Sequence, residues 1–202
     1  SPLNDGENYT GLETFSVTFN GNGNTSGSAP STITSTINSK VVLPNENTLV
    51  KTGNYLFSWN TKADGTGENY QPGDSILLTN NLTLYAKWSI ATYTITYNGN
   101  GNTSGLAPSS VSGSYNSTTT ISNKNTLVKV GPSGNIDFIG WNTQANGTGT
   151  SYQPGDIIAF SANITLYAQW NIVYNTVTFN GNGNTGGSSP SSSTVESGSI
   201  II

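Results

Sequence analysis

The sequence predicts an all-β or β-rich protein built from small tandem domains with mostly antiparallel sheets, and three features of its 202 residues support this expectation. Long stretches recur along the chain. Within each stretch, apolar and polar residues alternate over short segments, as they do in half-buried strands. Thr and aromatic residues, which favour strands, are separated by Asn-Gly pairs, which favour tight turns. No segment has the periodicity of an amphipathic helix.

The repeat is visible in loop sequences and in the spacing of tryptophans. The sequence NGNGNTSG, or a close copy of it, stands at Asn20–Gly27, Asn98–Gly105 and Asn180–Gly187. Trp59 and Trp141 are 82 residues apart, and so are Trp88 and Trp170. Self-similarity at this period indicates tandem copies of one small structural unit.

The repeats divide the chain as follows: 1–15, an N-terminal extension or the end of a preceding repeat; 16–88, the first repeat; 89–93, a linker; 94–170, the second repeat; 171–175, a linker; and 176–202, a partial third repeat. Neither linker is a long Gly/Ser or Pro tract, so both are expected to be semi-rigid. The second repeat carries four extra residues between Lys129 and Trp141, which we place around Gly131–Gly134 and near Gly140.

Each complete repeat is expected to contain five strands. In the first repeat these are the segments around Val17 and Phe19, Lys40–Leu43, the alternating Tyr55, Phe57 and Trp59, Ile76–Leu78, and Leu82–Trp88. In the second repeat Phe138 and Trp141 are three residues apart, and a β-bulge at Ile139–Gly140 would restore them to one face. All four tryptophans, Trp59, Trp88, Trp141 and Trp170, are expected to be core residues, and a sugar-stacking platform is the alternative.

Several of these segments resemble a known family. The sequences LYAKW at Leu84–Trp88, LYAQW at Leu166–Trp170, FIGW at Phe138–Trp141 and VTFNGNG at Val17–Gly23 are similar to the Listeria–Bacteroides repeat, also called the internalin B-repeat. The resemblance covers nearly the whole chain beyond residue 15, although the first repeat lacks the glycine before Trp59. It implies a compact β-grasp-like fold, an extracellular or wall-associated location, and no catalytic residues to carry over.

Composition excludes several classes of function. Charged residues make up only 8% of the chain and the net charge is −4, so the basic stripe that a nucleic-acid partner requires is absent. No stretch approaches the roughly 18 apolar residues of a membrane span. The lack of His and Cys excludes thiol catalysis, a His-based triad and the common zinc sites. We expect no enzyme, no catalytic residue and no cofactor.

The sequence of one loop resembles that of a calcium-binding loop. Asp64–Glu68 reads DGTGE and is followed by Asp74, and hard cations bind several oxygens. The second repeat has NGTGT at Asn146–Thr150, which carries neither carboxylate. Only Asp74 and Asp156 recur, each in a Pro-Gly-Asp turn that explains them without a metal. We therefore predict turns here and no metal site.

Two pairs of N-x-S/T sequons stand at matched positions of the repeats. They are Asn24 with Asn102 and Asn81 with Asn163. In an exported protein, such sequons on exposed loops are candidate N-glycosylation sites, which makes a glycoprotein one of the expectations.

The third repeat offers candidate assembly contacts. Its apolar residues are Val177, Phe179, Ile200, Ile201 and Ile202, and without further strands they would leave a free apolar edge. Strand addition from a second copy, with Ser1–Phe15 as the spare segment, would give head-to-tail association, which does not close and so makes a filament.

The function predicted from these features is structural. We expect an extracellular repeat protein on a microbial cell surface that serves as a spacer, a stalk or a self-assembling filament subunit. The alternative is an adhesin module that binds carbohydrate or a host receptor. Exposed aromatic side chains would favour the adhesin, and aromatic side chains confined to the core would favour the structural role.

Overall fold

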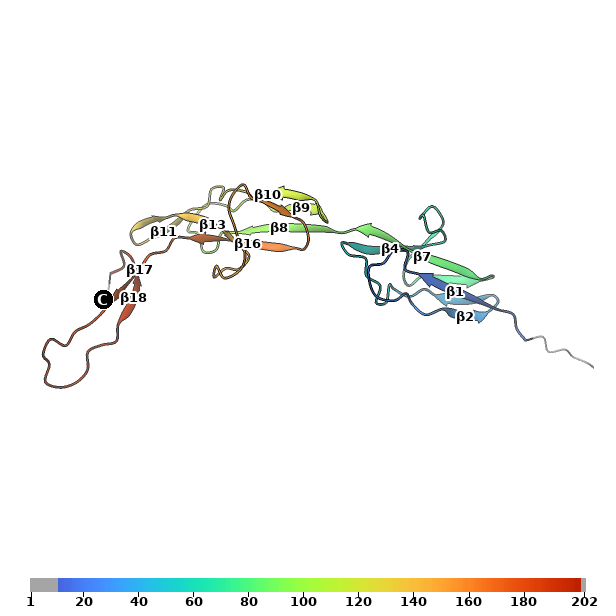
Figure 1. Ribbon diagram of the computed structural model, residues 1–202, viewed down its shortest axis with the longest axis horizontal. Helices are drawn as coiled ribbons and strands as arrows, with labels where there is room; N and C mark the ends of the chain where they lie inside the picture. The colour runs from blue at the N-terminus through green and yellow to red at the C-terminus, as the bar shows by residue number, and fades with distance from the viewer. Residues whose placement is uncertain (1–10, 201–202) are drawn as a thin grey trace, which may run out of the picture. The chain divides into compact units, whose positions relative to one another are not determined.

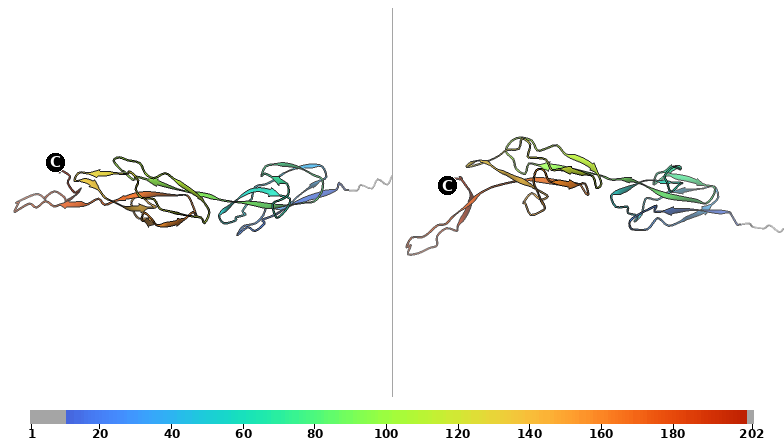
Figure 2. Two further views of the ribbon diagram at one scale, coloured as in Figure 1. Left: turned by 90° about the horizontal axis from the view of Figure 1, so that it is seen from above. Right: turned by 45° about the horizontal axis from the view of Figure 1, so that its top comes forward.

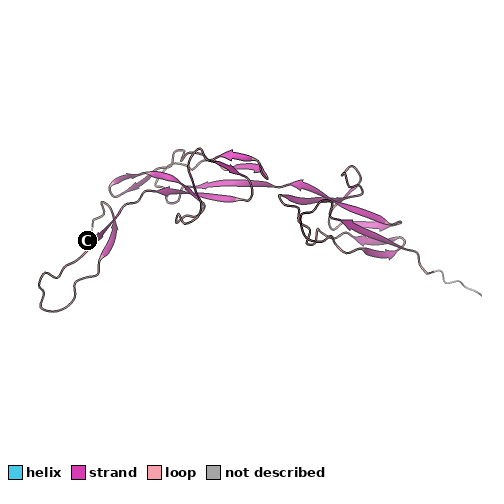
Figure 3. Ribbon diagram, viewed as in Figure 1, coloured by secondary structure: helices cyan, strands magenta, loops and turns pink. Residues whose placement is uncertain are grey.

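The computed structural model describes residues 11–200, which consist of β-strands, turns and loops with no helix among them (Figure 3). The expected all-β fold is confirmed. By its contacts the chain divides into two compact units, Ser1–Ala91 and Thr92–Ile202. Figure 1 shows the first in blue to green and the second in green to red.

The described part of the first unit, from residue 11 on, contains seven strands: β1 (Thr14–Asn20), β2 (Ile33–Thr36), β3 (Ser39–Val42), β4 (Asn54–Asn60), β5 (Asn69–Tyr70), β6 (Ser75–Leu78) and β7 (Leu82–Ile90). Five of them form a sheet in the order β2-β1-β7-β4-β5, and β3 pairs with β6 in a separate small sheet. The first and last strands, β1 and β7, are neighbours and run parallel, with Val17 opposite Leu82. The other pairings of this unit are antiparallel within the described residues.

The core of the first unit lies between these two sheets. Inward-facing residues of the large sheet, among them Val17, Trp59 and Leu84, are fully buried. The ring of Phe19 packs on the indole of Trp59 with centroids 4.9 Å apart. Strands β3 and β6 close the other side with apolar residues such as Leu78. Each unit thus buries its own apolar face and forms a separate hydrophobic core.

The second unit repeats this plan with nine strands and adds a hairpin. The strands are β8 (Thr92–Asn98), β9 (Val111–Ser114), β10 (Thr118–Thr120), β11 (Lys129–Gly131), β12 (Gly134–Ile136), β13 (Phe138–Asn142), β14 (Ser151–Tyr152), β15 (Ile157–Ala159) and β16 (Ile164–Trp170), and the hairpin is β17 (Tyr174–Val177) with β18 (Ser193–Glu196). The large sheet has the order β14-β13-β16-β8-β9. Its first and last strands, β8 and β16, are again parallel neighbours.

The boundary between the repeats differs from the expected linker at 89–93. Strand β7 continues to Ile90, and β8 begins at Thr92. Ala91 alone separates the two strands, and its N–H donates to the Gly53 carbonyl, 2.8 Å away. The segment expected to be a linker therefore consists almost entirely of strand.

The expected facing of the third strand is wrong in the first unit. The register of β4 on β7 shifts between Leu56 and Ser58, so this strand contains a β-bulge. Leu56 packs on the core, while the alternating Tyr55 and Phe57 are 53% and 46% exposed. The bulge in the second unit lies where it was expected, between Phe138 and Gly140.

The extra residues of the second unit all lie in one place. Both units have the bulge, so no insertion is needed near Gly140. The hairpin of β11 and β12 replaces the short turn that joins Lys51 to Asn54 in the first unit. At its tip the Ser133 hydroxyl donates to the carbonyl of Ser197, next to β18, at 2.7 Å. The insertion thus contacts the β17–β18 hairpin.

Deletion of Pro132–Asn135 should loosen the β17–β18 hairpin without unfolding the rest of the second unit. The shortened turn would match the one that the first unit already uses, and the contact of Ser133 with Ser197 would be lost. We expect faster amide hydrogen exchange across β17 and β18 and unchanged exchange in β13 and β16. Unchanged exchange in the hairpin would contradict a supporting role of the insertion.

The β17–β18 hairpin reproduces the register of β8 and β9. Tyr174 pairs with Glu196 as Thr92 pairs with Ser114, and the intervening pairs correspond one to one. Strand β17 stops at Val177, whereas β8 continues to Asn98 in contact with the parallel strand β16. Beyond Val177 the chain forms the long hairpin loop seen in both views of Figure 2.

Candidate functional site

The most extensive side-chain hydrogen bonding of each unit lies where two loops contact the final large-sheet strand along the chain, which is β7 in the first unit and β16 in the second. In the first unit these are the loop that begins at Asn20 and the loop from Asn60 to Asn69, and both contact β7. We call this region the loop cluster. Its residue types recur in the second unit, so the two copies can be compared atom by atom.

Asn60 is the centre of the loop cluster and is fully buried. Its Nδ2 donates to the carbonyls of Gly65 and Gly67 and to Oδ1 of Asn69, at 3.3, 3.1 and 2.7 Å. Its Oδ1 accepts from the N–H groups of Lys62 and Gly67 at 2.8 and 3.1 Å. One amide therefore holds the whole loop from residue 60 to residue 69 in a closed shape.

Asn142 occupies the same position in the second unit and makes equivalent bonds. Its Nδ2 donates to the carbonyls of Gly147 and Gly149 and to the hydroxyl of Ser151. Its Oδ1 accepts from the N–H groups of Gln144 and Gly149. The arrangement thus survives the loss of the loop's charged residues, because Lys62, Asp64 and Glu68 are replaced by Gln144, Asn146 and Thr150.

A second asparagine ties the other loop to the last strand. Asn22 has a positive φ of 48°, and its Nδ2 donates to the carbonyls of Ala63 and Ala86 at 2.8 and 2.9 Å. Asn100 does the same in the second unit, with the carbonyls of Ala145 and Ala168, both at 2.8 Å. The Asn-Gly pairs therefore do more than form turns, because their side chains lock the loop to β7 or β16.

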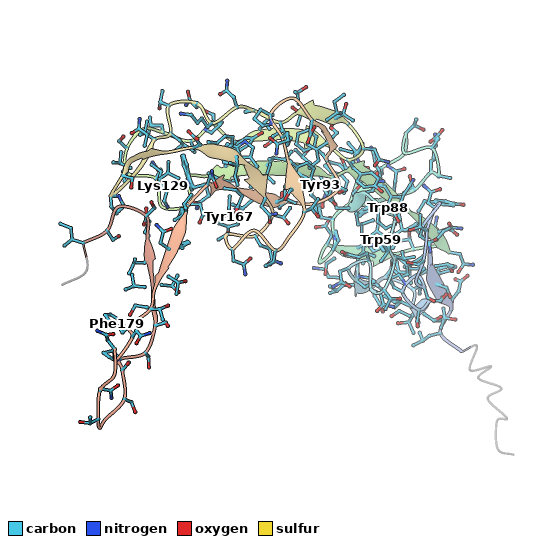
Figure 4. The ribbon with its side chains drawn as sticks, turned by 60° about the vertical axis from the view of Figure 1, so that its left-hand side comes forward. Trp59, Trp88, Tyr93, Lys129, Tyr167 and Phe179 are labelled. Carbon is cyan, nitrogen blue, oxygen red and sulfur yellow. The ribbon has the colours of Figure 1, made fainter. Side chains whose placement is uncertain are left out.

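The four tryptophans fall into two kinds of position. Trp59 and Trp141 are fully buried, and their Nε1 atoms donate to the carbonyls of Pro44 and Ser122. Trp88 and Trp170 are partly buried against the cores, and their Nε1 atoms donate to the carbonyls of Gly21 and Gly99 at 2.9 and 3.0 Å. Figure 4 shows Trp59 and Trp88 among the packed side chains of the first unit.

A hollow of about 260 Å³ lies beside the loop cluster of the first unit and is lined in part by Lys51, Asp64, Lys87 and Trp88. The Lys87 ammonium donates to the Gly65 carbonyl at 3.1 Å and lies 5.9 Å from the ring centre of Phe57. The matching residues of the second unit are Lys129, Asn146, Gln169 and Trp170, of which only Lys129 is charged. The charges of Asp64 and Lys87 are therefore particular to the first unit, whereas the lysine at position 51 recurs as Lys129.

The ionisable groups of the loop cluster serve its structure. Hydrogen bonds from the Thr66 hydroxyl and N–H lower the pKa of Asp64. Partial burial, with a further contribution from Glu68, raises the pKa of Tyr70. Asn146 accepts the same two bonds from Thr148 that Asp64 accepts from Thr66. An uncharged amide thus replaces the carboxylate here without a change in the loop.

The aspartates of the suspected calcium loop and of the Pro-Gly-Asp turns each hold a turn. Asp64 bonds to Thr66, and the Oδ2 atoms of Asp74 and Asp156 accept from the N–H groups of Gln71 and Gln153. Among residues 11–200, no three Asp or Glu side chains gather closely enough to hold a metal ion. The absence of a metal site remains a prediction.

Chelation should leave the first unit unchanged. Because Asp64 and Asp74 are bonded to their own turns, we expect the same melting temperature with EDTA and with millimolar calcium. Differential scanning calorimetry at both conditions measures this directly, and Asp64→Asn, which copies Asn146 of the second unit, is the matched control. A rise in melting temperature with calcium that Asp64→Asn abolishes would contradict the assignment as turns.

The four sequon asparagines lie in two structural settings. Asn24 and Asn102 are hydrogen-bonded through Nδ2 to two main-chain carbonyls of their own loops. Asn81 and Asn163 are exposed, and each accepts a bond through Oδ1, from the N–H groups of Ser16 and Thr94 respectively. Glycan attachment consumes an Nδ2 hydrogen, so it would disturb the bonds of Asn24 and Asn102. Its use stays a prediction at all four positions.

The candidate assembly residues lie on and beyond the β17–β18 hairpin. Val177 is half-buried at the end of β17, while Phe179 and Ile200 are 40% and 89% exposed. Figure 4 shows Phe179 on the hairpin, away from the packed side chains of the unit. Ile201 and Ile202 lie outside the described residues, as does most of the segment Ser1–Phe15.

The structural roles of Asn60 and Asn142 were not predicted from the sequence. Asn60 and Asn142 follow Trp59 and Trp141, and each precedes a loop with the pattern Gly-Thr-Gly, so the pairing of a Trp-Asn step with that loop was the available signal. The Asn-Gly pattern around Asn22 predicts a turn from backbone conformation and does not indicate what the side chain contacts. Polar residues in loops are normally exposed, and only the folded loop shows that these amides are enclosed.

No helix among residues 11–200 has the length and apolar character needed to cross a membrane. The chain is 35% identical to a protein of Evansella cellulosilytica named "Putative Gly-rich membrane protein", over 84% of this chain and 20% of that protein. It is 41% identical to a second protein of the same organism, named "Putative membrane protein", over 46% of this chain and 14% of that protein. The chain thus covers a fifth or less of the length of these relatives. No solved structure matches it.

The profile of the Listeria–Bacteroides repeat domain matches residues 15–87 and 93–169. These ranges coincide with the two units that carry β1 to β7 and β8 to β16, each with its own core and loop cluster. The chain therefore belongs to the Listeria–Bacteroides repeat domain family, of which it contains two tandem copies.

Proposed function

We propose that this chain is a spacer in an extracellular protein attached to a microbial cell surface, and that it has no catalytic role. The observation that carries the proposal is that each repeat closes its own core, while a single residue, Ala91, joins the last strand of one to the first strand of the next. Modules of this kind extend a chain by a fixed unit and can be added or removed singly.

The surface supports the same role. Polar loops rich in Asn, Ser and Thr cover the units, and only 8% of all residues are charged. The relatives are named as membrane proteins and are several times longer than the match, which suits a repeat segment that holds other parts away from the cell. The buried tryptophans and the bonded loop clusters stabilise the modules.

An adhesin is the second candidate, and one observation favours it. Tyr55 and Phe57 are exposed on β4 of the first unit, with Lys87 near the ring of Phe57, and exposed aromatic rings can stack on sugars. The second unit has Asp137, Ile139 and Gln169 at these positions, so such a site would belong to one repeat only.

Binding to a glycan array separates the two candidates. A spacer predicts no saturable binding by the purified chain and no difference between wild type and Tyr55→Ser/Phe57→Ser. Saturable binding to one glycan class that this double variant abolishes, with unchanged folding, would establish the adhesin and overturn the spacer as the main function.

Self-association is a further proposal for the same chain. The exposed Phe179 and the outer edge of β17, which pairs with β18 alone among the described residues, could receive a strand from a second copy. Sedimentation velocity over a wide concentration range tests this. The structure places Thr14 and Phe15 in β1, so the segment available for donation ends before them. Concentration-dependent polymers that disappear on deletion of residues 1–12, which leaves β1 whole, would support head-to-tail addition, and a constant monomer would exclude it.

A further inference from the structure

We propose that each repeat is a mechanical clamp whose first and last strands are held together against tension along the chain. The inference rests on the proposed spacer only for the origin of the tension, because a surface spacer is pulled at its two ends. The clamp itself is a property of the fold and can be measured on the purified chain.

The geometry of the terminal strands decides how a unit responds to pulling. The chain enters the first unit at the start of β1 and leaves it at the end of β7, and these strands are parallel neighbours. Tension therefore pulls the two strands past each other along their length. In this shear geometry all the bonds between β1 and β7 share the load and must break together. Strands pulled apart from one end lose their bonds one at a time.

The main-chain ladder of the clamp runs from Val17 opposite Leu82 to Asn20 opposite Tyr85. Its equivalent in the second unit runs from Ile95 opposite Ile164 to Asn98 opposite Tyr167. Parallel ladders have evenly spaced, slanted hydrogen bonds, so sliding strains them together.

Three side chains extend this ladder beyond its main-chain bonds in the first unit. At the entry end, Oδ1 of Asn81 accepts from the Ser16 N–H at 2.9 Å. At the exit end, Asn22 donates to the Ala86 carbonyl at 2.9 Å, and the Trp88 indole donates to the Gly21 carbonyl at 2.9 Å. Each bond joins the β1 segment to the β7 segment, and together they continue the connection past both ends of the ladder.

The second unit has all three ties in the same places. Asn163 accepts from the Thr94 N–H at 2.8 Å. Asn100 donates to the Ala168 carbonyl at 2.8 Å, and Trp170 donates to the Gly99 carbonyl at 3.0 Å. Asn22 and Asn100 of the loop clusters therefore share one role with the exposed sequon asparagines Asn81 and Asn163, which is to fasten the load-bearing pair of strands.

The absence of cysteine makes the direction of pulling easy to choose. Handles at Glu13→Cys and Ile90→Cys load the first unit in shear, because they lie at opposite ends of the β1–β7 pair. Handles at Glu13→Cys and Asn80→Cys lie at the same end of that pair and peel β1 from β7. Force spectroscopy then compares two directions of pulling on one fold, with equal chemical stability verified in urea.

We expect the unfolding rate at a given force to be lower in shear than in peeling by about tenfold or more, because several bonds must break at once. Equal rates in the two directions would overturn the clamp. That outcome would leave the spacer standing, because a spacer needs folded modules but no particular direction of strength.

Matched variants in the second unit test the side-chain ties. Asn163→Ala removes a bond to Thr94 from the loaded side of β8, and Ser112→Ala removes the hydroxyl bond between Ser112 and Thr94, 2.7 Å long, from the unloaded side. Handles at Ala91→Cys and Asn171→Cys load β8 and β16 in shear. We expect Asn163→Ala to raise the unfolding rate under this load by about fivefold to tenfold, which corresponds to the loss of one hydrogen bond. Ser112→Ala should leave that rate unchanged.

The comparison is decisive because both variants lose one hydrogen bond to the same residue. If Ser112→Ala raises the rate under load as much as Asn163→Ala, or if neither variant changes it, the side-chain ties carry no load and this part of the proposal is wrong. Unfolding rates in urea, extrapolated to zero denaturant, show whether either variant acts on stability in general instead of on resistance to tension.

Discussion

Trp141→Ala should destabilise the second unit by about 3–5 kcal/mol, the usual cost of removing a large aromatic side chain from a core. The indole is fully buried, contacts the rings of Tyr97 and Phe138 at 4.8 and 5.1 Å, and donates to the Ser122 carbonyl. Its removal would leave a large cavity and an unpaired carbonyl. The free energy of unfolding of a domain of this size is about 5–15 kcal/mol, so the variant would lose much of its stability.

Pulse proteolysis in urea, with peptides assigned to each unit, measures this loss. The first unit is the internal reference, since its own core contains Trp59 and is separate. Trp170→Ala should lower the free energy of unfolding of the second unit less than Trp141→Ala does, because Trp170 is only partly buried. Equal stability of Trp141→Ala and wild type would show that the core does not depend on this side chain.

Asn60→Ala should unfold or loosen the loop from residue 60 to residue 69 and cost about 3 kcal/mol or more, since one buried amide makes five hydrogen bonds there. The N–H groups of Lys62 and Gly67 would lose their acceptor inside the protein. Hydrogen exchange at these two amides reports the effect locally. Exchange and melting equal to wild type would contradict the central role of Asn60.

Asn60→Asp distinguishes donor from acceptor contributions. The new carboxyl would still accept from Lys62 and Gly67 but would face the carbonyls of Gly65 and Gly67 with a negative charge. Burial and these carbonyls would raise its folded-state pKa above the unfolded value. The stability of this variant should therefore be greatest in acid and fall as the pH rises through the ordinary carboxyl range towards the folded-state pKa. A variant whose stability does not change with pH more than that of wild type would contradict this assignment.

The sequence predicted the repeats, the family and the all-β class because each depends on local or repeated patterns. Identical loops and a constant tryptophan spacing reveal the repeat, and alternation reveals strands such as β7. The pairing of β1 with β7 could not be read in this way, because alternation gives the face of a strand and not its neighbour or direction.

The bulge in β4 shows how a regular pattern can mislead. Tyr55, Phe57 and Trp59 alternate without interruption and indicate one continuous face. The bulge at Phe57 shifts the strand by one residue, which turns Leu56 inward and leaves Phe57 exposed. In the second unit the same bulge was detectable, because the apolar residues Phe138 and Trp141 are out of phase.

The loop cluster was the least predictable part. Asn22, Asn60 and their counterparts act through main-chain carbonyls that are distant in sequence, such as that of Ala86 for Asn22. The residue type does not reveal which main-chain carbonyl an asparagine contacts, because every residue has a main-chain carbonyl. The sequence therefore showed that the asparagines recur, and the structure shows which contacts they make.

The spacer is tested most directly by replacing both repeats, residues 14–170, with an unrelated pair of ligand-free β-domains. The altered protein is displayed on the surface of the organism that makes the native one. The measurement is the surface phenotype that deletion of the same residues removes, such as attachment or accessibility of the neighbouring parts to antibodies. A spacer predicts that the unrelated pair restores the phenotype. Restoration by the native repeats alone would contradict the spacer and assign the function to their own surface.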